Sequence, residues 1–371
     1  MKNIKKLLAI TISVLLLAST LAACTGAPAG TKAPAADGSK PYIAVISKGF
    51  QHQFWQTVYK GAQDAAAKYN VSITFEGPPS ESDINNQLDM LNAAIAKKPV
   101  ALALAALDTK SVTSQLNDCK AKGIPVIGFD SGVPGAPEGT IKATAATDNE
   151  AAGALAADKM FAAAGFQDKI KAATTDKPVI IGLESQDATS ASIVGRTVGF
   201  INQMVKNCET LQAGKVEVKG HDKYNKAAGS GKAAVVIQVV VPPSTSVTDC
   251  TVGAQSLLAM ENLLGIFASN SGSVDGILAA TTDGKDLDRA SGKYKDLIVI
   301  GFDAGKTLKN AVRQKWFYGA ITQDPYMIGY LSVELAYKAY KGEAVADSDT
   351  GCKFYDSSNM DQADIAQLLY D

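Results

Sequence analysis

Apolar and polar positions alternate in blocks along the first third of the chain. Short apolar runs with the length of buried strands are separated by longer stretches with the spacing of amphipathic helices. The predicted strands are 42–47, 71–76, 99–106 and 124–129, and the predicted helices between them are 54–69, 83–97 and 110–122. Strands that alternate with helices of this length predict βαβ units and a parallel sheet.

The same pattern restarts after a polar segment at 144–149, which we interpret as a crossing into a second lobe. The Gly- and Lys-rich stretch 215–232 predicts an exposed hairpin or loop. A late helix over 326–340 is expected to return to the first lobe, and the tail from Thr350 to cross back again. The other elements predicted for this part are helices 150–164, 192–207 and 250–267 and strands 178–183, 234–241 and 318–322.

One phrase, Val-Ile-Gly-Phe-Asp, occurs twice, at 126–130 and at 299–303. Each copy ends an apolar run, as a buried parallel strand would, and is preceded by a second apolar run that also ends in aspartate, at 102–108 and at 277–283. The two strand ends are 22 residues apart in the first copy and 20 in the second, room for one helix. Two strand–helix–strand copies predict two similar lobes, with acidic side chains lining a cleft between their carboxyl edges.

The N-terminus has the composition of an export signal. Residues 1–6 are basic, 7–17 are apolar but too short to span a membrane comfortably, and Leu21-Ala22-Ala23-Cys24 places small residues before a cysteine. This pattern predicts a bacterial lipoprotein signal peptide over 1–23 with a lipid on Cys24, and a plain secretory signal with an incidental cysteine is the alternative. Residues 24–40 predict a flexible tether, so an extracytoplasmic protein anchored to the cell membrane is expected.

The rest of the chain, about 330 residues, is long enough for two domains with their own cores. We expect an N-terminal lobe formed by 41–147 plus 325–349, and a C-terminal lobe formed by 148–324 plus 350–371. The formal net charge is -1 and Lys and Arg form no dense stripe, so nucleic acid is not an expected partner.

Candidate catalytic and metal chemistry is sparse. Neither of the two histidines, His52 and His221, lies near a plausible nucleophile, and no Cys/His cluster has metal-ligand spacing. No glycine-rich dinucleotide fingerprint follows the first strand. We therefore expect no enzymatic activity, no metal and no cofactor. The scattered cysteines besides Cys24 are interpreted as structural thiols, with one disulfide as the alternative, and they are Cys119, Cys208, Cys250 and Cys352.

Candidate binding groups are more numerous. The loop after the first strand carries Lys48 and the adjacent aromatics Phe54 and Trp55, which can present a flat face to a ligand or simply pack the following helix. Asp130 and Asp303 can face the cleft or cap helices. The guanidinium of Arg196 suits vicinal hydroxyls or a carboxylate, and a surface salt bridge is its alternative role.

These features together resemble the type I periplasmic binding proteins of ribose/galactose-type ABC importers, over residues 41–371. The resemblance rests on the Phe54-Trp55 loop, the segment 124–130, the crossing at 147–149, the helix around Arg196, and the strand ends at Gly-Phe-Asp303 and Gln323 to Pro325. It implies an α/β fold of two similar Rossmann-like lobes, each a parallel sheet flanked by helices, joined by a hinge.

The resemblance also implies roles for individual residues. Phe54 and Trp55 would stack on a sugar ring, Asp130, Arg196, Asp303 and Gln323 would hydrogen-bond its hydroxyls, and 147–149 and Gln323 would flank hinge strands. The expected ligand-binding set is Lys48, Phe54, Trp55, Asp130, Ser131, Asp148, Arg196, Thr282, Asp283, Asp303 and Gln323.

The chain departs from the family's pentose binders at three places. His52-Gln53 stands where they often have Asn-Pro, Asp130-Ser131 where they often have Asp-Arg, and Thr282-Asp283 where they often have Asn-Asp. Lys48 resembles the pocket lysine of autoinducer-2 receptors with the same fold. The ligand is therefore less defined than the fold.

The function that follows is a lipid-anchored, monomeric receptor that captures a monosaccharide or similar small polyol and delivers it to an ABC permease in the membrane. The alternative is a sensory receptor of the same fold, for autoinducer-2 or a sugar, that feeds a signalling partner. A transcriptional regulator of this fold would need DNA-reading helices where the signal peptide stands. An exported hydrolase is disfavoured because no nucleophile–base pair is evident.

Overall fold

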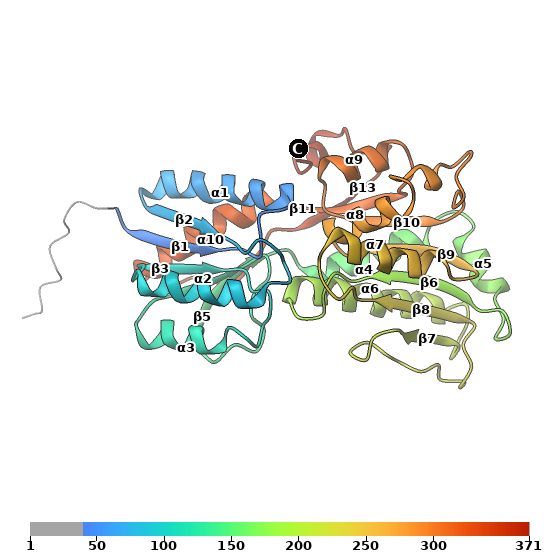
Figure 1. Ribbon diagram of the computed structural model, residues 1–371, viewed down its shortest axis with the longest axis horizontal. Helices are drawn as coiled ribbons and strands as arrows, with labels where there is room; N and C mark the ends of the chain where they lie inside the picture. Colours follow the sequence, from blue (N-terminus) through green and yellow to red (C-terminus); the bar gives the residue numbers. More distant parts are fainter. Residues whose placement is uncertain (1–39, 371) are drawn as a thin grey trace, which may run out of the picture. The chain divides into compact units, whose positions relative to one another are not determined.

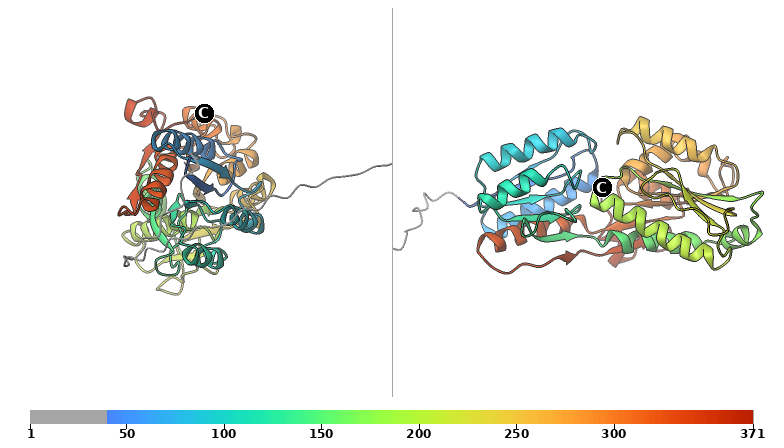
Figure 2. Two further views of the ribbon diagram at one scale, coloured as in Figure 1. Left: turned by 90° about the vertical axis from the view of Figure 1, so that its left-hand side faces the viewer. Right: turned by 90° about the horizontal axis from the view of Figure 1, so that it is seen from below.

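The structure is a computed structural model that describes residues 40–370, and it confirms the two-lobe α/β fold predicted from the sequence (Figure 1). Each lobe is built on one sheet, and all of the strand pairs are parallel except β11 with β13. Helices cover both faces of each sheet (Figure 2). The predicted signal peptide, the predicted lipidation site Cys24 and the predicted tether up to residue 39 lie outside the described residues.

The first lobe is defined here as the elements around a six-stranded sheet with the order β12-β5-β4-β3-β1-β2. Its strands are β1 (Tyr42–Ile46), β2 (Ser72–Glu76), β3 (Ala101–Leu104), β4 (Val126–Phe129), β5 (Ile141–Ala146) and β12 (Ser348–Asp349). Its helices are α1 (Gln53–Tyr69), α2 (Ile84–Ala96), α3 (Thr113–Ala121) and α10 (Pro325–Tyr340).

The second lobe is defined as the elements around a seven-stranded sheet with the order β13-β11-β10-β9-β6-β8-β7. Its strands are β6 (Val179–Glu184), β7 (Val216–Lys219), β8 (Val235–Val240), β9 (Leu263–Ala268), β10 (Ile298–Phe302), β11 (Gly319–Gln323) and β13 (Cys352–Tyr355). Its helices are α4 (Asn149–Phe161), α5 (Phe166–Ala172), α6 (Ala191–Glu209), α7 (Val247–Leu258), α8 (Ser271–Ala280), α9 (Lys306–Arg313), α11 (Ala363–Ala366) and the 3₁₀ turn η1 (Lys285–Leu287).

The strands are apolar on both faces because helices bury both sides of each sheet. In β1, Ile43 and Val45 pack toward α1 and α10, whereas Ala44 and Ile46 pack toward α2 and α3. Successive strand residues point to opposite faces, so a continuous apolar run is what a doubly covered strand requires. The chain passes between the sheets three times, from β5 to α4, from β11 to α10 and from β12 to β13.

Closely packed helix pairs flank the crossings. Between α4 and α6, a Cβ atom on Gly153 would collide with the carbonyl oxygen of Arg196, and one on Gly199 would collide with that of Glu150. Glycine therefore permits the backbones of the two helices to touch, which sets the position of α6 and the side chains it carries. The matching pair between α1 and α10 uses Gly61 and Gly329.

The sequence prediction for the second strand–helix–strand copy is partly wrong. Residues 277–283, predicted as a strand and its end, form the end of α8 and the turn after it. The strand beside β10 is instead β9, which lies in the second half of the helix predicted over 250–267. A short apolar run does not distinguish a buried strand from a buried helix. The boundary is marked by Asn270, whose side chain accepts the backbone N–H of Ser273 as a helix N-cap.

One other prediction needs correction, and one is confirmed. The stretch 215–232 begins with β7, which is an edge strand paired with β8, and then folds back so that Val218 bridges Lys226 in antiparallel fashion. The segment 144–149, predicted as a crossing, starts within β5 and ends where α4 begins. Helices α5 and α9 had no counterpart in the predicted elements.

The four cysteines of the described residues are free thiols, and burial raises the pKa of each. None of the helices within residues 40–370 combines the length and the apolar character needed to cross a membrane.

Glu184 is an unusual core residue. It ends β6, is fully buried beside Gly253 of α7, and neither of its carboxyl oxygens has a hydrogen-bond partner in residues 40–370. Burial raises the pKa of Glu184 to about 9, because a charged carboxylate there would lose its hydration without compensation. The side chain is therefore protonated at neutral pH.

We predict that Glu184→Gln will flatten the pH dependence of stability. The folded-state pKa of Glu184 lies above the unfolded value, so the folded state holds a proton that the unfolded state releases. As the pH rises from about 5 to about 9, the free energy of unfolding should therefore fall by about 1.4 kcal/mol per pH unit. Urea unfolding at several pH values should show this slope in the parent and lose it in the variant. Glu138→Gln, at an exposed glutamate, is the control; equal slopes in the parent and in Glu184→Gln would contradict the assignment.

Candidate functional site

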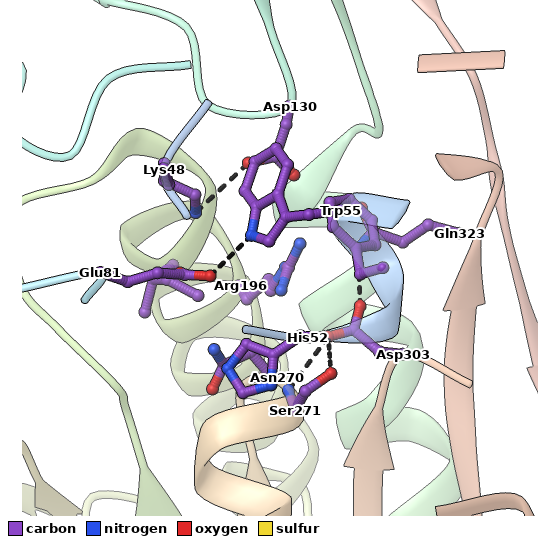
Figure 3. Close-up of a pocket in the computed structure, with 12 residues that line it drawn as sticks. Lys48, His52, Trp55, Glu81, Asp130, Arg196, Asn270, Ser271, Asp303 and Gln323 are labelled. Carbon is purple, nitrogen blue, oxygen red and sulfur yellow. Dashed lines mark hydrogen bonds and ion pairs between the residues drawn. The ribbon is translucent and has the colours of Figure 1, made fainter. Parts of the chain in front are cut away.

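A polar cavity lies between the lobes, at the carboxyl ends of strands from both sheets (Figure 3). Ligand sites of open parallel sheets form at this edge. The lining residues are Lys48, His52, Phe54, Trp55, Glu81, Asp130, Ile193, Arg196, Asn270, Ser271, Asp303 and Gln323.

The two copies of the repeated phrase bring Asp130 and Asp303 into this cavity with matching backbone geometry. Their φ angles are +51° and +79°. The backbone N–H of Asp130 donates to the carbonyl of Ala145 at 3.0 Å, and that of Asp303 to the carbonyl of Ile321 at 2.7 Å. Aspartate tolerates the left-handed region better than most residues other than glycine. The same turn thus delivers one carboxylate from each lobe.

Lys48 follows β1 and is buried between the lobes. Its Nζ lies 3.2 Å from Asp130 Oδ2 and donates to Ser192 Oγ of α6, in the other lobe, at 2.9 Å. Burial alone would lower the pKa of Lys48, but the nearby carboxylates of Asp130, Glu81 and Asp187 outweigh it and the pKa is raised. The ammonium group is therefore charged. Burial raises the pKa of Asp130, and the charges of Lys48 and Arg196 offset only part of that effect.

The aromatic wall comes from the first turn of α1. Phe54 and Trp55 meet edge to face with ring centroids 5.0 Å apart, and Trp55 is 1% exposed. The indole Nε1 donates to Glu81 Oε1 at 2.7 Å, which holds the ring in one orientation. An aromatic surface of this kind is preformed for a ligand ring.

Glu81 lies in the loop after β2 and uses both carboxylate oxygens. Oε1 accepts from Trp55, and Oε2 accepts from Gln186 Nε2 of the second lobe at 3.1 Å. Burial alone would raise the pKa of Glu81, but Lys48, His52 and these hydrogen bonds outweigh it and the pKa is lowered. The group is a carboxylate at neutral pH.

Arg196 projects from α6 into the cavity. Its Nε donates to Asn149 Oδ1 at 2.8 Å, its Nη1 donates to the carbonyl of Ser269 at 3.0 Å, and its guanidinium lies 3.8 Å from the ring centroid of Phe302. Stacking and two fixed hydrogen bonds orient the fork. Its Nη2 has no hydrogen bond to another residue of the described chain, so it is available to a ligand.

Asp303 sits in a network of neutral donors. Its Oδ2 accepts from the backbone N–H and the hydroxyl of Ser271 at 3.0 and 2.8 Å, and its Oδ1 accepts from Gln323 Nε2 at 2.8 Å. Ser271 is the first residue of α8, so the carboxylate also lies at the positive end of a helix. The cavity wall here is rigid and hydrogen-bonded from three elements.

Two buried acceptor oxygens of the wall remain without a hydrogen-bond partner among residues 40–370. They are Gln323 Oε1 and Asp130 Oδ2, of which Asp130 Oδ2 forms an ion pair with Lys48 Nζ at 3.2 Å. A buried acceptor left unpaired costs about 1–3 kcal/mol. Hydroxyl groups on a ligand would remove that cost, because each can donate one hydrogen bond.

Direct hydrogen bonds join the lobes around the cavity, so the described conformation is closed. Besides the bonds from Lys48 and Glu81, the backbone N–H of Ser192 donates to Ser131 Oγ at 3.3 Å and Thr189 Oγ1 donates to the carbonyl of Leu107 at 2.9 Å. A further one links the hydroxyls of Ser80 and Thr245 at 3.1 Å.

The structure brings most of the expected ligand-binding residues together. Those that line the cavity are Lys48, Phe54, Trp55, Asp130, Arg196, Asp303 and Gln323. Ser131 is buried beside it and contacts the other lobe through Ser192.

Three expected residues lie elsewhere. Asp148 is exposed and caps α4 by accepting the backbone N–H of Ala151 at 3.0 Å. Thr282 and Asp283 are exposed beyond the far end of α8, whose first residue is the one at the cavity. Ten helical residues separate the two ends, about 15 Å. The misassigned strand over 277–283 explains this error.

Five lining residues were not in the expected set: His52, Glu81, Ile193, Asn270 and Ser271. Asn270 and Ser271 follow β9, the strand that the sequence pattern missed. His52 belongs to the loop already singled out after the first strand. Glu81 follows a correctly predicted strand. Its carboxylate near the carboxyl end of that strand was the signal that could have identified it as a site residue.

The chemistry of the cavity is that of hydrogen bonding and ring contact. Within residues 40–370, no group of three or more His, Cys, Asp or Glu side chains is placed to hold a metal ion. Carboxylates, two amides, a guanidinium and two aromatic rings converge instead, which is the composition of a site for a small polar ligand.

Comparison with known proteins gives consistent matches. A family model described as a periplasmic binding protein domain matches residues 43–344. A solved structure from Brachyspira murdochii, described as an ABC transporter, LacI family transcriptional regulator, is 40% identical, covers 90% of this chain and 99% of that one, and superposes with a TM-score of 0.73. An ABC transporter solute binding protein from Agrobacterium vitis with bound D-fucose is 27% identical, with 89% and 100% covered and a TM-score of 0.72. The ribose import binding protein of Bacillus subtilis (strain 168) is 24% identical over 345 residues, which are 90% of this chain and 94% of that protein.

Proposed function

Because this chain belongs to the periplasmic binding protein family, we propose that it is an extracytoplasmic, lipid-anchored solute-binding protein. It captures a monosaccharide or a similar small polyol between its lobes and delivers it to an ABC importer. The names of two relatives, one an import protein for ribose and one a solute binding protein holding D-fucose, support a sugar ligand and a transport role. The same membership supports binding without catalysis.

The single observation that carries the proposal is a cavity with an aromatic wall in which Gln323 Oε1 has no partner and Asp130 Oδ2, beside Lys48, can accept a further hydrogen bond. A sugar offers a hydroxyl donor to each acceptor and an apolar ring face to Phe54 and Trp55. Arg196 Nη2 would donate to a ring or hydroxyl oxygen. A ligand that lacks one hydroxyl would leave a buried group unpaired, which gives selectivity.

Capture requires the lobes to separate. Lobes formed by 41–147 plus 325–349 and by 148–324 plus 350–371 would rotate about the three crossings, and the ligand would favour the closed form through contacts with both lobes. The protein is proposed to act as a monomer, since each chain contributes both walls of its own cavity.

We predict that Asp130→Asn and Asp303→Asn will each weaken sugar binding roughly tenfold to a hundredfold, because a hydrogen bond to a charged group contributes about 1.5–3 kcal/mol. Asparagine is chosen because it tolerates the positive φ at both positions. Calorimetry should follow a thermal-shift screen of neutral monosaccharides that includes ribose and D-fucose. Asp283→Asn, at an exposed aspartate that also has a positive φ, is the matched control. Wild-type affinity in both folded variants would place the ligand elsewhere.

We also predict that the cavity discriminates against anionic sugars. Its wall holds three carboxylates, Glu81, Asp130 and Asp303, against the two cations Arg196 and Lys48, and Lys48 already contacts Asp130 and Ser192. A uronate should therefore bind at least about tenfold more weakly than its neutral parent sugar, a difference of about 1.4 kcal/mol. Competition of D-galactose and D-galacturonate against the tightest ligand of the screen measures this. Equal or tighter binding of the uronate would assign the site to sugar acids.

The anchoring proposal is tested separately. Cys24→Ala removes the thiol that would carry the lipid, and we expect the full-length protein to move from the membrane to the soluble extracytoplasmic fraction. Cys119→Ala, at a buried free thiol, should leave the protein with the membranes. Continued membrane association of the Cys24 variant would refute the anchor.

A further inference from the structure

A chain of hydrogen bonds runs from the aromatic wall across the lobe boundary. Trp55 Nε1 donates to Glu81 Oε1 at 2.7 Å, Gln186 Nε2 donates to Glu81 Oε2 at 3.1 Å, and Asn270 Nδ2 donates to Gln186 Oε1. Trp55 and Glu81 belong to the first lobe, and Gln186 and Asn270 follow β6 and β9 of the second. Three of these four side chains line the cavity.

The position of Glu81 in this chain requires a carboxylate. Two donors approach it, one from each lobe, and each takes one oxygen. A carboxylate has two acceptor oxygens and no donor, whereas an amide could accept from only one of the two donors and would turn its own N–H groups toward the other. Glu81 is also 8% exposed, so water has little access to replace a lost partner.

We infer that Glu81 is a positioning residue that couples the orientation of the Trp55 indole to closure of the lobes. When the lobes are together, Gln186 holds the carboxylate in place and the carboxylate holds the indole against the cavity. When they part, Glu81 loses its partner in the second lobe, and the indole is held from one side only. The aromatic wall is therefore complete only in the closed state.

This inference uses the proposed function only in giving Trp55 a ligand to contact. It can be tested without any ligand, because every bond in the chain is made by the protein itself. If no sugar binds the parent protein, the proposed function fails while the coupling remains measurable.

The chain offers an optical readout, since Trp55 and Trp316 are its two tryptophans. In a Trp316→Phe background, the emission maximum and acrylamide quenching report Trp55 alone, and small-angle scattering of the same unliganded samples reports closure. Glu81→Gln places an introduced amide opposite the amide of Gln186, and Gln186→Glu places an introduced carboxylate opposite that of Glu81. Each should increase the radius of gyration, shift the emission to longer wavelength and increase quenching.

The double variant Glu81→Gln/Gln186→Glu is the decisive sample. The exchange reverses donor and acceptor: the introduced amide oxygen can accept from Trp55 and its N–H can donate to the introduced carboxylate, which can still accept from Asn270. Both readouts should return toward the parent values. Gln186→Leu removes the bond to Glu81 and the acceptor for Asn270 while leaving Glu81 itself unchanged, and it serves if Glu81→Gln does not fold by circular dichroism.

Thr245→Val is the matched control. It removes a hydrogen bond between the lobes, to Ser80 next to Glu81, but no bond of the chain from Trp55 to Asn270, so the Trp55 emission should change less than in Glu81→Gln. Single variants that leave emission and radius unchanged would overturn the inference. A larger radius of gyration without a change in emission would also overturn it. The same holds if the double variant restores neither readout relative to the single variants, or if Thr245→Val shifts the emission as much as Glu81→Gln does.

Discussion

The burial of five charged side chains at the boundary between the lobes is the constraint on which the rest of the site depends. Lys48, Arg196, Glu81, Asp130 and Asp303 are all nearly inaccessible to water. Charges removed from water are tolerated only when other charges and hydrogen bonds replace their hydration. That requirement explains why the strand ends, the start of α1, the first turns of α6 and the start of α8 all converge on one small volume.

The two lobes share the same backbone turn at a strand end, but the aspartate in that turn has different partners in each lobe. Asp130 and Asp303 occupy equivalent turns, yet Asp130 faces the ammonium of Lys48, whereas Asp303 is held by the neutral donors of Ser271 and Gln323. A carboxylate beside a cation and one in a network of neutral donors present different partners to a ligand. The backbone positions of the two aspartates are therefore similar in the two lobes, whereas the groups that they present to a ligand differ.

The sequence was most informative where the spacing of apolar residues and the residues that end helices and strands indicated the same elements. The first lobe has short strands, helices between them and glycine after a helix. Its strands β1 to β4 were predicted correctly, with Lys48 and Asp130 just beyond two of them, whereas β5 and β12 were not predicted. In the second lobe, the apolar runs 263–268 and 277–280 flank the polar stretch from Ser269 to Asp275, and β9 and α8 were misassigned because a short apolar run does not distinguish a buried strand from a buried helix. Glu81 and Gln186 could not be paired from the sequence, because they meet across lobes and 105 residues apart.

The glycine contact between α4 and α6 implies that ligand recognition depends partly on residues that do not contact the ligand. Arg196 reaches the Ser269 carbonyl and the Phe302 ring only because Gly153 and Gly199 let the two helices approach to backbone contact. A methyl group at either glycine would translate α6 and carry the guanidinium away from the cavity without altering a single lining residue. Divergence of ligand preference among proteins built this way can therefore arise at helix–helix seams, and a comparison restricted to cavity-lining positions would overlook it.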